Sequence, residues 1–591
     1  MRSKCGRFVL TFNGEIYNYQ ELRDELEQRG YEFKGTSDTE VLAEGFSCWG
    51  IGPTVLKAVG MFAIGIWDNV REELSLIRDR MGEKPLYYGF VGMDLVFASE
   101  LKAFRAHPEW RGIVDDAALK LYFTYGYIPH PYAIFQNVFQ LTPGAILTAG
   151  RRHIEQKELP VAERYWKLEE EYRQGMEHSI DGSEEEILAG LEAIMERSVR
   201  SQMVADVPIG AMLSGGIDSS VVVALMQRCS KTPVKTFTIG FSSSEESEAA
   251  KARRVATALG TEHTEQIISA SDAIDEVARM AGIFDEPFAD SSQIPTYIVS
   301  KLARQKVKVC LSGDAGDELL LGYPSYARAQ HAYRALRWIP RSIRIALSES
   351  LQKVPESIWR LLADSEMLGL GSEGIDRVRK GLKVFGFSNY ADLHVTAAQS
   401  FVGGFVHDTV GVETPVDLLV QNQGRDARGQ ISYLGLCDLV SYLSSDILTK
   451  VDRSAMAVSL ETRVPLLDHR FVRYTFGLRD RWKLQNGSGK YILRKLYKRL
   501  LPSEALPQRK QGFGLPLEEW IRGPMRPWAE ELLSEKALSQ HEYINSAAAR
   551  NLWKEHIGGT RRWHFPIWQL LMFQAWYGAQ GSSCIDTRHP F

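Results

Sequence analysis

The sequence predicts an α/β protein in two parts. Residues 1 to about 165 contain short alternating apolar runs punctuated by Gly, Asn and Asp, which is typical of stacked antiparallel sheets. From about residue 185, strand and helix patterns alternate, as in a doubly wound parallel sheet. A glycine-hydroxyl turn at residues 214–220 joins a buried-strand pattern to a helix pattern, which places a candidate ligand site in the second part.

Size and composition limit the class of protein. A chain of 591 residues exceeds what one hydrophobic core supports, so two or more domains are expected. The net charge of -4 and pI near 6.4 argue against nucleic-acid and membrane partners. We find no basic-then-apolar leader and no apolar run of about 20 residues, so we expect a cytoplasmic protein. Six cysteines without a CxxC pair indicate neither a zinc site nor a disulfide framework.

The first part contains two predicted helices, at residues 19–29 and 39–49, each preceded by a polar capping candidate. Alternating apolar residues predict strands over residues 8–12, 62–67, 73–77, 86–88 and 95–97. Residues 152–183 are rich in Glu, Arg and Lys with little periodicity, which predicts a linker or a pair of surface strands.

The second part contains predicted strands at residues 207–213, 234–241, 261–268 and 307–312. Helices are predicted between them, at residues 221–226, 247–259 and 273–281, and residues 326–580 are expected to be mainly helical. Ligands of doubly wound sheets bind beyond the carboxyl ends of the strands. The turns that follow the first and last of these strands are therefore the candidate site.

The turn Ser214-Gly-Gly-Ile-Asp-Ser-Ser220 suits phosphate oxygens. Glycines that lead a strand into a helix direct backbone N–H groups, and the positive end of the helix dipole, at one place. A Walker loop would need a Lys before Ser or Thr, whereas here Asp218 occupies the turn. An acid beside phosphate requires a metal between them, so we expect Mg-nucleotide held by its pyrophosphate and attacked at the α-phosphate. The alternative is an ordinary strand-to-helix turn.

Several further strings follow a single pattern along the chain: Asn13-Gly-Glu-Ile-Tyr-Asn18, Ser37-Asp-Thr-Glu40, Arg78-Asp-Arg80, Lys84-Pro-Leu-Tyr-Tyr88, Phe97-Ala-Ser-Glu-Leu-Lys102, Leu311-Ser-Gly-Asp-Ala-Gly-Asp-Glu318, Lys450-Val-Asp-Arg453, Glu461-Thr-Arg-Val-Pro-Leu-Leu-Asp-His469, Gly489-Lys490 and Lys510-Gln-Gly-Phe-Gly514. Together they resemble the glutamine-hydrolysing asparagine synthetases over nearly the whole chain. The resemblance implies an incomplete Ntn-hydrolase-type αββα glutaminase (1–165), a linker (166–184), an ATP-pyrophosphatase synthetase domain of the HUP class (185–580) and a tail (581–591).

The resemblance also implies a reaction. ATP would adenylate the carboxylate of aspartate, and ammonia, delivered from glutamine through an internal channel, would displace AMP to form asparagine. ATP and Mg²⁺ are the implied cofactors, aspartate and glutamine or ammonia the implied substrates, and a homodimer is an assembly that the sequence permits.

The resemblance assigns roles to individual residues. Asp218 and Asp317 match the acids that share Mg²⁺, Asp314 a base that deprotonates ammonium, and Lys490 a lysine that stabilises the acyl-adenylate transition state. The ATP-binding positions are Leu213, Ser214, Gly215, Gly216, Asp218, Ser219, Ser220, Ile239, Ser312 and Gly313. The glutamine-binding positions are Asn13 and Gly14, as an oxyanion hole, and Glu15 and Asp38, at the amino end. Helix capping by Asp317, and a surface location for Lys490, are the structural alternatives.

The chain departs from the family in two places. Family members begin Met-Cys-Gly, whereas this chain begins Met-Arg-Ser-Lys-Cys, and Cys5 aligns with a turn residue whose amine lies in a peptide bond. We therefore expect that Cys5 is not the nucleophile and that the chain as given uses ammonia only. Ala315 stands where relatives are often richer in glycine, which predicts a stiffer loop.

Other functions stay open at this point. The leading hypothesis is an amide ligase that forms asparagine. Its alternatives are amidation of another carboxylate, such as a surface-polysaccharide sugar acid or a ring-closing β-amino acid, and a catalytically silent nucleotide-binding homologue. A tRNA-modifying or GMP-forming relative is disfavoured by the acidic pI and by the lack of paired catalytic cysteines.

Overall fold

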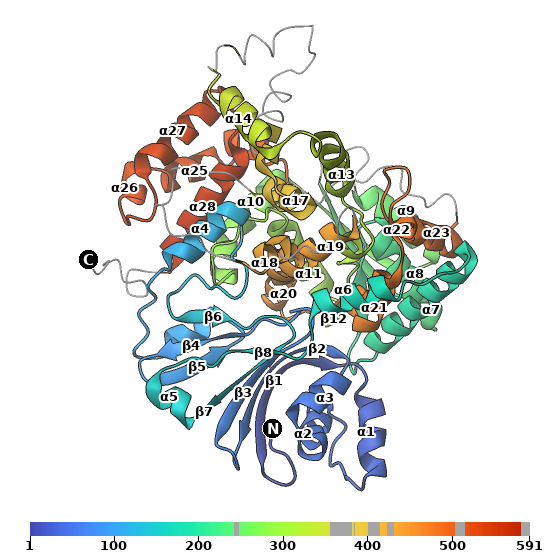
Figure 1. The fold of residues 1–591 in the computed structure, drawn as a ribbon. Coiled ribbons are helices and arrows are strands. Elements are labelled where there is room, and N and C mark those ends of the chain that lie inside the picture. The colour runs from blue at the N-terminus through green and yellow to red at the C-terminus, as the bar shows by residue number, and fades with distance from the viewer. Residues whose placement is uncertain are drawn as a thin grey trace.

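The computed structural model describes residues 1–241, 248–354, 358, 381–382, 384–399, 414–421, 431–502 and 515–580. The string at 510–514 and the predicted tail at 581–591 lie outside these ranges. In the described residues, two antiparallel sheets build the N-terminal half and one parallel sheet lies at the centre of the C-terminal half (Figure 1). The predicted fold class is confirmed.

The N-terminal half has an αββα arrangement. Its strands form a five-stranded sheet and a three-stranded sheet. In spatial order, the five-stranded sheet consists of β1 (Phe8–Ile16), β2 (Gly60–Asp68), β3 (Glu73–Arg78), β7 (Ala145–Gly150) and β8 (Glu163–Arg164). The three-stranded sheet consists of β5 (Asp94–Ala98), β4 (Tyr87–Val91) and β6 (Val138–Gln140). Leu76, Tyr88 and Leu147 pack between the two sheets. The alternation of apolar residues therefore places one layer of side chains in this core.

Helices cover the outer face of the larger sheet. They are α1 (Tyr19–Gln28), α2 (Asp38–Trp49) and α3 (Ile51–Lys57). Leu26 and Phe46 pack against Leu10 and Ile64 of the sheet. Ser37 caps α2 by accepting a hydrogen bond from the backbone N–H of Thr39, which confirms the helix start expected from the sequence.

Helix α4 (Asp116–Tyr125), which the sequence analysis did not predict, joins the two halves. Its Tyr122 donates a hydrogen bond to the carbonyl of Gln569 on α28 (His564–Ala579), at 2.7 Å. Phe123 and Phe573 meet with ring centroids 5.8 Å apart. One hydrophobic core therefore extends across the boundary between the halves.

The C-terminal half contains a five-stranded parallel sheet. Its order is β11 (Glu262–Ile268), β10 (Lys235–Phe241), β9 (Ile209–Met212), β12 (Val309–Leu311) and β13 (Glu461–Arg463). The chain moves outward from β9 to β10 and β11, then returns to place β12 on the other side of β9. This reversal is a topological switch point, where open α/β sheets bind their ligands. Strand β13 was missed because three residues within a helical region give no alternation signal.

Helices cover both faces of this sheet. Leu213 and Val222 pack on the face covered by α7 (Glu184–Gln202), α8 (Ile217–Cys229) and α9 (Glu248–Leu259). Ile239 and Ile294 pack on the face covered by α10 (Ala270–Ile283) and α11 (Gln293–Arg304). The predicted doubly wound arrangement is confirmed.

The other helices lie mostly around the parallel sheet (Figure 1). They are η1 (Leu101–Ala106), α12 (Gly316–Leu319), α13 (Pro324–Leu336), α14 (Arg341–Gln352), η2 (Val384–Gly386), α17 (Tyr390–Ala398), α18 (Pro415–Gln421), α19 (Ser432–Asp438), the π-helix η4 (Leu439–Ile447), α20 (Leu448–Met456), η5 (Pro465–Leu467), α21 (His469–Gly477), α22 (Asp480–Lys483), α23 (Tyr491–Leu500), α24 (Leu517–Arg522), α25 (Arg526–Leu532), α26 (Glu535–Leu538) and α27 (Ser546–Ile557). No helix in the described ranges is both long and apolar enough to span a bilayer.

The segment 152–183, predicted as a linker or a pair of surface strands, contains one two-residue strand, β8, and is otherwise partly helical, so the prediction missed its helices. These are α5 (Arg151–Gln156) and α6 (Leu168–Glu177). Leu168 and Tyr172 form a narrow buried stripe on α6 among many charged residues, so the helical period was hard to recognise in the sequence. Tyr172 packs edge-on against Phe476 of α21, with centroids 5.4 Å apart.

Gly175 allows α6 to approach α21 closely. A Cβ atom at this position would lie 2.7 Å from the backbone of Phe476. We expect Gly175→Ala to lower stability by about 1–3 kcal/mol through overpacking, measured as a lower thermal unfolding midpoint. Gly282→Ala on α10 is the matched control, because no atom lies within 4 Å of its Cβ position and alanine favours helix. Equal midpoints for the two variants would contradict the close packing.

Candidate active site

The predicted phosphate loop follows β9 and leads into α8. Gly215 has φ +70°, and a Cβ atom there would lie 2.6 Å from the backbone nitrogen of Ala252, so this turn requires glycine. No side chain caps the start of α8 at Gly216. The Ser214 and Ser219 hydroxyls lie 3.0 Å apart. The first turn of α8 therefore presents backbone N–H groups and a positive dipole end, which suit an anion.

A second loop, Ser312–Asp314, lies beside the first because β12 pairs with β9. A Cβ atom on Gly313 would lie 2.6 Å from the backbone nitrogen of Ser219. The structure thus brings together two of the predicted ATP-binding segments. Leu213 and Ile239 are buried on opposite faces of the sheet, so their predicted contact with adenine would have to come from backbone atoms.

Lys490 joins the two predicted metal-binding acids. Its Nζ lies 2.7 Å from an oxygen of Asp317 and also contacts Asp218, and the side chain is almost fully buried. Burial lowers the pKa of Lys490, but the charges of Asp218 and Asp317 outweigh it and leave the pKa above its usual value. The ammonium group therefore stays charged. A surface location for Lys490 is excluded.

Glycines allow this cluster to close. A Cβ atom on Gly322 would overlap Asp317 and Lys490, at 2.0 and 2.1 Å, and one on Gly316 would lie 2.3 Å from Asp218. Neither position can accept a side chain without moving the charged groups. Gly316 and Gly322 are thus explained by packing around the ion pairs.

The same acids fit a nucleotide-bound magnesium ion. Asp218 and Asp317 converge on one cationic group, Lys490 Nζ, so their charges already meet at one place. Mg²⁺ prefers one or two carboxylates together with substrate phosphates. Within the described ranges, no cluster of three or more His, Cys, Asp or Glu side chains could hold a metal by itself. Asp218 and Asp317 would therefore hold Mg²⁺ only together with phosphate oxygens.

Asp314 lies at the end of β12, in the second loop. Burial raises the pKa of its carboxyl group, an effect opposed by Ser312 and Lys450. A raised pKa brings a carboxylate closer to the range in which it can accept a proton from ammonium, as its predicted role requires. The next residue, Ala315, is buried with φ +71°, a conformation that normally favours glycine.

The sequence analysis assigned no role to a second buried cation, Lys450. Its Nζ lies 2.7 Å from Asp290 and 2.8 Å from the Ser292 hydroxyl. Burial tends to raise the pKa of Asp290, but Lys450 overrides this and lowers it to about 2. The string Lys450-Val-Asp-Arg453 was the signal in the sequence that could have pointed to Lys450, although its partners Asp290 and Ser292 lie far away in sequence.

The four predicted glutamine-binding residues do not all line one cavity. Asn13 and Gly14 line a cavity of about 290 Å³ between the halves, which also contacts Lys84 and Glu461. Glu15 instead pairs with Arg463 of β13, at 3.2 Å.

Asp38 and Cys5 lie at other positions in the N-terminal half. Asp38 accepts a hydrogen bond from the backbone N–H of Ile16, at 3.0 Å. Cys5 is exposed in a turn, and its thiol contacts Ser3 and Ser47. This agrees with the turn position that the sequence analysis gave to Cys5.

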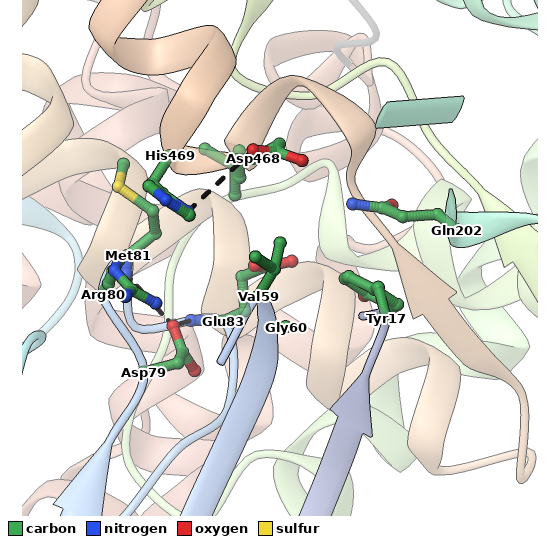
Figure 2. A pocket seen from close by; sticks show the side chains of 11 residues that line it. Tyr17, Val59, Gly60, Asp79, Arg80, Met81, Glu83, Gln202, Asp468 and His469 are labelled. Carbon is green, nitrogen blue, oxygen red and sulfur yellow. Dashed lines mark hydrogen bonds and ion pairs between the residues drawn. The ribbon is translucent and has the colours of Figure 1, made fainter. Parts of the chain in front are cut away.

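Buried polar contacts cross the boundary between the halves. Lys84 and Asp452 pair at 3.0 Å, and Tyr87 donates a hydrogen bond to Glu286 at 2.7 Å. Burial raises the pKa of Glu286 to about 7. A small cavity of about 10 Å³ lies in the same boundary, where Tyr17 of the N-terminal half and Gln202 of the C-terminal half both line it (Figure 2).

Fold and site together define a two-part protein, in which an antiparallel αββα half is joined to a parallel-sheet half with a nucleotide-type loop at its switch point. Residues 1–166 match the family model "Glutamine amidotransferase domain", and residues 190–578 match "Asparagine synthase". The chain belongs to the asparagine synthase family.

Curated relatives cover most of the chain. Glutamine-hydrolysing asparagine synthetase 1 of Bacillus subtilis is 31% identical, over 96% of this chain and 85% of that protein. Asparagine synthetase 3 of the same organism is 29% identical, over 92% and 81%. Amidase chyE of Penicillium rubens is 27% identical, over 90% and 80%.

The Lys490 cluster leads to a stability prediction. Lys490→Met should leave two neighbouring carboxylates without their shared cation, and losing one partner of a buried pair costs about 3–5 kcal/mol. The expected cost lies at the lower end, because each acid keeps about one-sixth of its side chain exposed. Adding Asp218→Asn and Asp317→Asn should recover much of the loss in thermal midpoint. A triple variant no more stable than Lys490→Met would contradict this charge balance.

The Tyr87–Glu286 contact leads to a pH prediction. Burial raises the pKa of Glu286 to about 7 in the folded protein, whereas the pKa of an exposed Glu in the unfolded chain is near 4.5, so between these values the folded state keeps a proton that the unfolded state releases. This contribution to stability is complete below pH 4.5 and is lost as pH rises through 7. We expect the thermal midpoint of the wild type to fall, relative to that of Glu286→Gln, between pH 5 and 7. Parallel midpoint curves would contradict the raised pKa.

Proposed function

We propose that the chain catalyses ATP-dependent amide formation, converting aspartate, ATP and ammonia to asparagine, AMP and pyrophosphate through an acyl-adenylate. The observation that supports this most strongly is the convergence of Lys490, Asp218 and Asp317 beside the glycine turn. An acid in the turn and the absence of a Walker lysine favour binding through the departing pyrophosphate, which leaves the α-phosphate open to a carboxylate.

The residues of the cluster take distinct parts in this proposal. The Ser214–Ser220 turn would bind pyrophosphate oxygens through backbone N–H groups. Mg²⁺, held by Asp218 and Asp317, would neutralise charge on the phosphates. Lys490 would exchange a carboxylate partner for the developing negative charge at the reacting centre. Asp314 would take the proton that ammonium loses before it attacks.

In this proposal ammonia is the nucleophile that displaces AMP. Asn13 and Gly14 share a cavity with groups from both halves, whereas Cys5 contacts Ser3 and Ser47 in its turn. A cytoplasmic location and a homodimeric assembly remain predictions.

A second candidate is amidation of another carboxylate. It is favoured by the similarity to a Penicillium protein named as an amidase, which extends over 90% of this chain. The two candidates share the adenylation step and differ in the acceptor.

The decisive assay follows the nucleotide product. Purified protein with ATP, Mg²⁺, ammonium and aspartate should release AMP and pyrophosphate together with asparagine, measured by chromatography of labelled ATP. Lys490→Met should lower kcat by about 10²–10³, as expected for loss of a group that stabilises transition-state charge. Arg173→Gln, which breaks only exposed pairs on α6, is the control and should leave kcat unchanged.

Two results would redirect the proposal. Release of ADP in place of AMP would reject the adenylation mechanism. AMP release that requires a carboxylate other than aspartate would favour the second candidate.

A further inference from the structure

An open pocket of about 390 Å³ is lined by residues of both halves, beside α6 and α21. Arg80 belongs to its N-terminal side, and His469 and Arg473 to its C-terminal side. Residues 164–167, in the segment that connects the halves, complete much of the lining. The volume lies in the range of pockets that bind small molecules. None of the predicted ATP-binding or glutamine-binding residues lines this pocket, so the proposed reaction gives it no role.

Positive charge exceeds negative charge around the pocket. Its lining contains four cationic and two acidic side chains, Arg80, Arg164, Lys167, Arg473, Glu170 and Glu171. Both acids already have partners, because Glu170 pairs with Arg173 at 2.6 Å and Glu171 accepts two hydrogen bonds from Arg473. Within the described ranges, neither Arg80 nor Lys167 forms an ion pair. This balance of charge favours an anion in the pocket.

Arg80 carries a buried charge whose hydrogen-bond partners are neutral. Its side chain is almost fully buried, beside the small boundary cavity that it also lines (Figure 2). Nη1 donates to the carbonyl of Ala58, and Nη2 donates to the carbonyls of Val55 and Leu56. These contacts fix the guanidinium group and use three of its five N–H donors. Burial lowers the pKa of Arg80, as expected for a buried cation without an anion in contact.

Unpaired N–H donors are also found at this pocket. In the part of the chain that the structure describes, Arg80 Nε, Arg164 Nε and Trp166 Nε1 are buried and have no hydrogen-bond partner. Buried N–H groups are nearly always paired, with protein atoms or with ordered water. The nearby His469 is in a positive potential, because burial and then the charge of Arg80 lower its pKa to about 3. Unpaired donors in a positive potential favour an anionic acceptor over water.

We propose that this pocket binds a small oxyanion, a carboxylate or phosphate group, through Arg80, Arg164 and Lys167. Arg80 supplies a fixed cation that needs no reorganisation, and the two residues of the connecting segment supply further charge. The ligand contacts residues of both halves at once. It therefore stabilises the folded, joined form by mass action.

The experiment is equilibrium dialysis of the full chain against labelled inorganic phosphate and, separately, labelled succinate, at an ionic strength held constant with chloride. We expect a Kd of about 1 mM or lower for at least one of the two anions, since a few charge-assisted hydrogen bonds suffice for this affinity. The Ser214 turn also suits phosphate, so the change caused by substitution in the pocket, and not binding alone, assigns the site.

Arg164→Gln should raise the Kd of the bound anion at least about tenfold, because it removes a charge-assisted contact. Arg151→Gln is the matched control: it removes the same charge from α5, where Arg151 forms only an exposed pair with Glu155, and should leave the Kd unchanged. Lys167→Gln repeats the test at an exposed side chain, in case Arg164→Gln lowers stability. Trp166→Phe removes the indole N–H, keeps an aromatic ring, and should also weaken binding.

Each outcome decides the proposal. Weaker binding in Arg164→Gln or Lys167→Gln than in Arg151→Gln supports the site, and the preferred anion then assigns it to phosphate or to carboxylate ligands. Binding of neither anion would mean that water alone fills the pocket, and this result, or equal Kd values in all the variants, overturns the proposal. A protein that binds the anion in this pocket but forms no AMP would keep this site and reject the amide-ligase function.

Discussion

The contact of one buried ammonium group with two aspartates is the interaction on which the candidate site depends. Lys490 holds Asp218 and Asp317, which come from loops more than 90 residues apart in sequence, at one place. Their carboxylate oxygens lie within about 5 Å of each other through this shared partner, and two such charges repel by roughly 3 kcal/mol at an effective dielectric constant of 20. The lysine makes this arrangement stable, and a nucleotide-bound Mg²⁺ would satisfy the same charges.

The two halves share one hydrophobic core across their boundary, in addition to the cores that lie within the N-terminal half. Helix α4 buries Tyr122 against α28, and the Lys84–Asp452 pair lies deep in the boundary. Buried ion pairs add little net stability, but they fix geometry because an unpaired partner would be costly. The boundary contacts therefore set the relative position of the two candidate sites more than they stabilise the fold.

Sequence patterns predicted the parts of the fold that have regular period or special turn chemistry. The strands around the Ser214 turn were found because parallel strands are apolar throughout, and the turn because glycine and hydroxyl residues cluster there. Helix α6 and strand β13 were missed, since a narrow stripe and a three-residue strand leave little periodic signal. The resemblance located Lys490 and Asp317, but only the fold could place their charged groups in contact.

The pairing of Glu15 with Arg463 illustrates what a linear pattern cannot supply. Glu15 belongs to a string near the start of the chain, and Arg463 to a string more than 400 residues later, so no local period connects them. Considered alone, each residue belongs only to the motif of its own half. Their contact arises because β1 and β13 end at the same boundary, and β13 in turn supports the loop after β12. A residue that contacts both halves is therefore found from the sheet order and not from either motif alone.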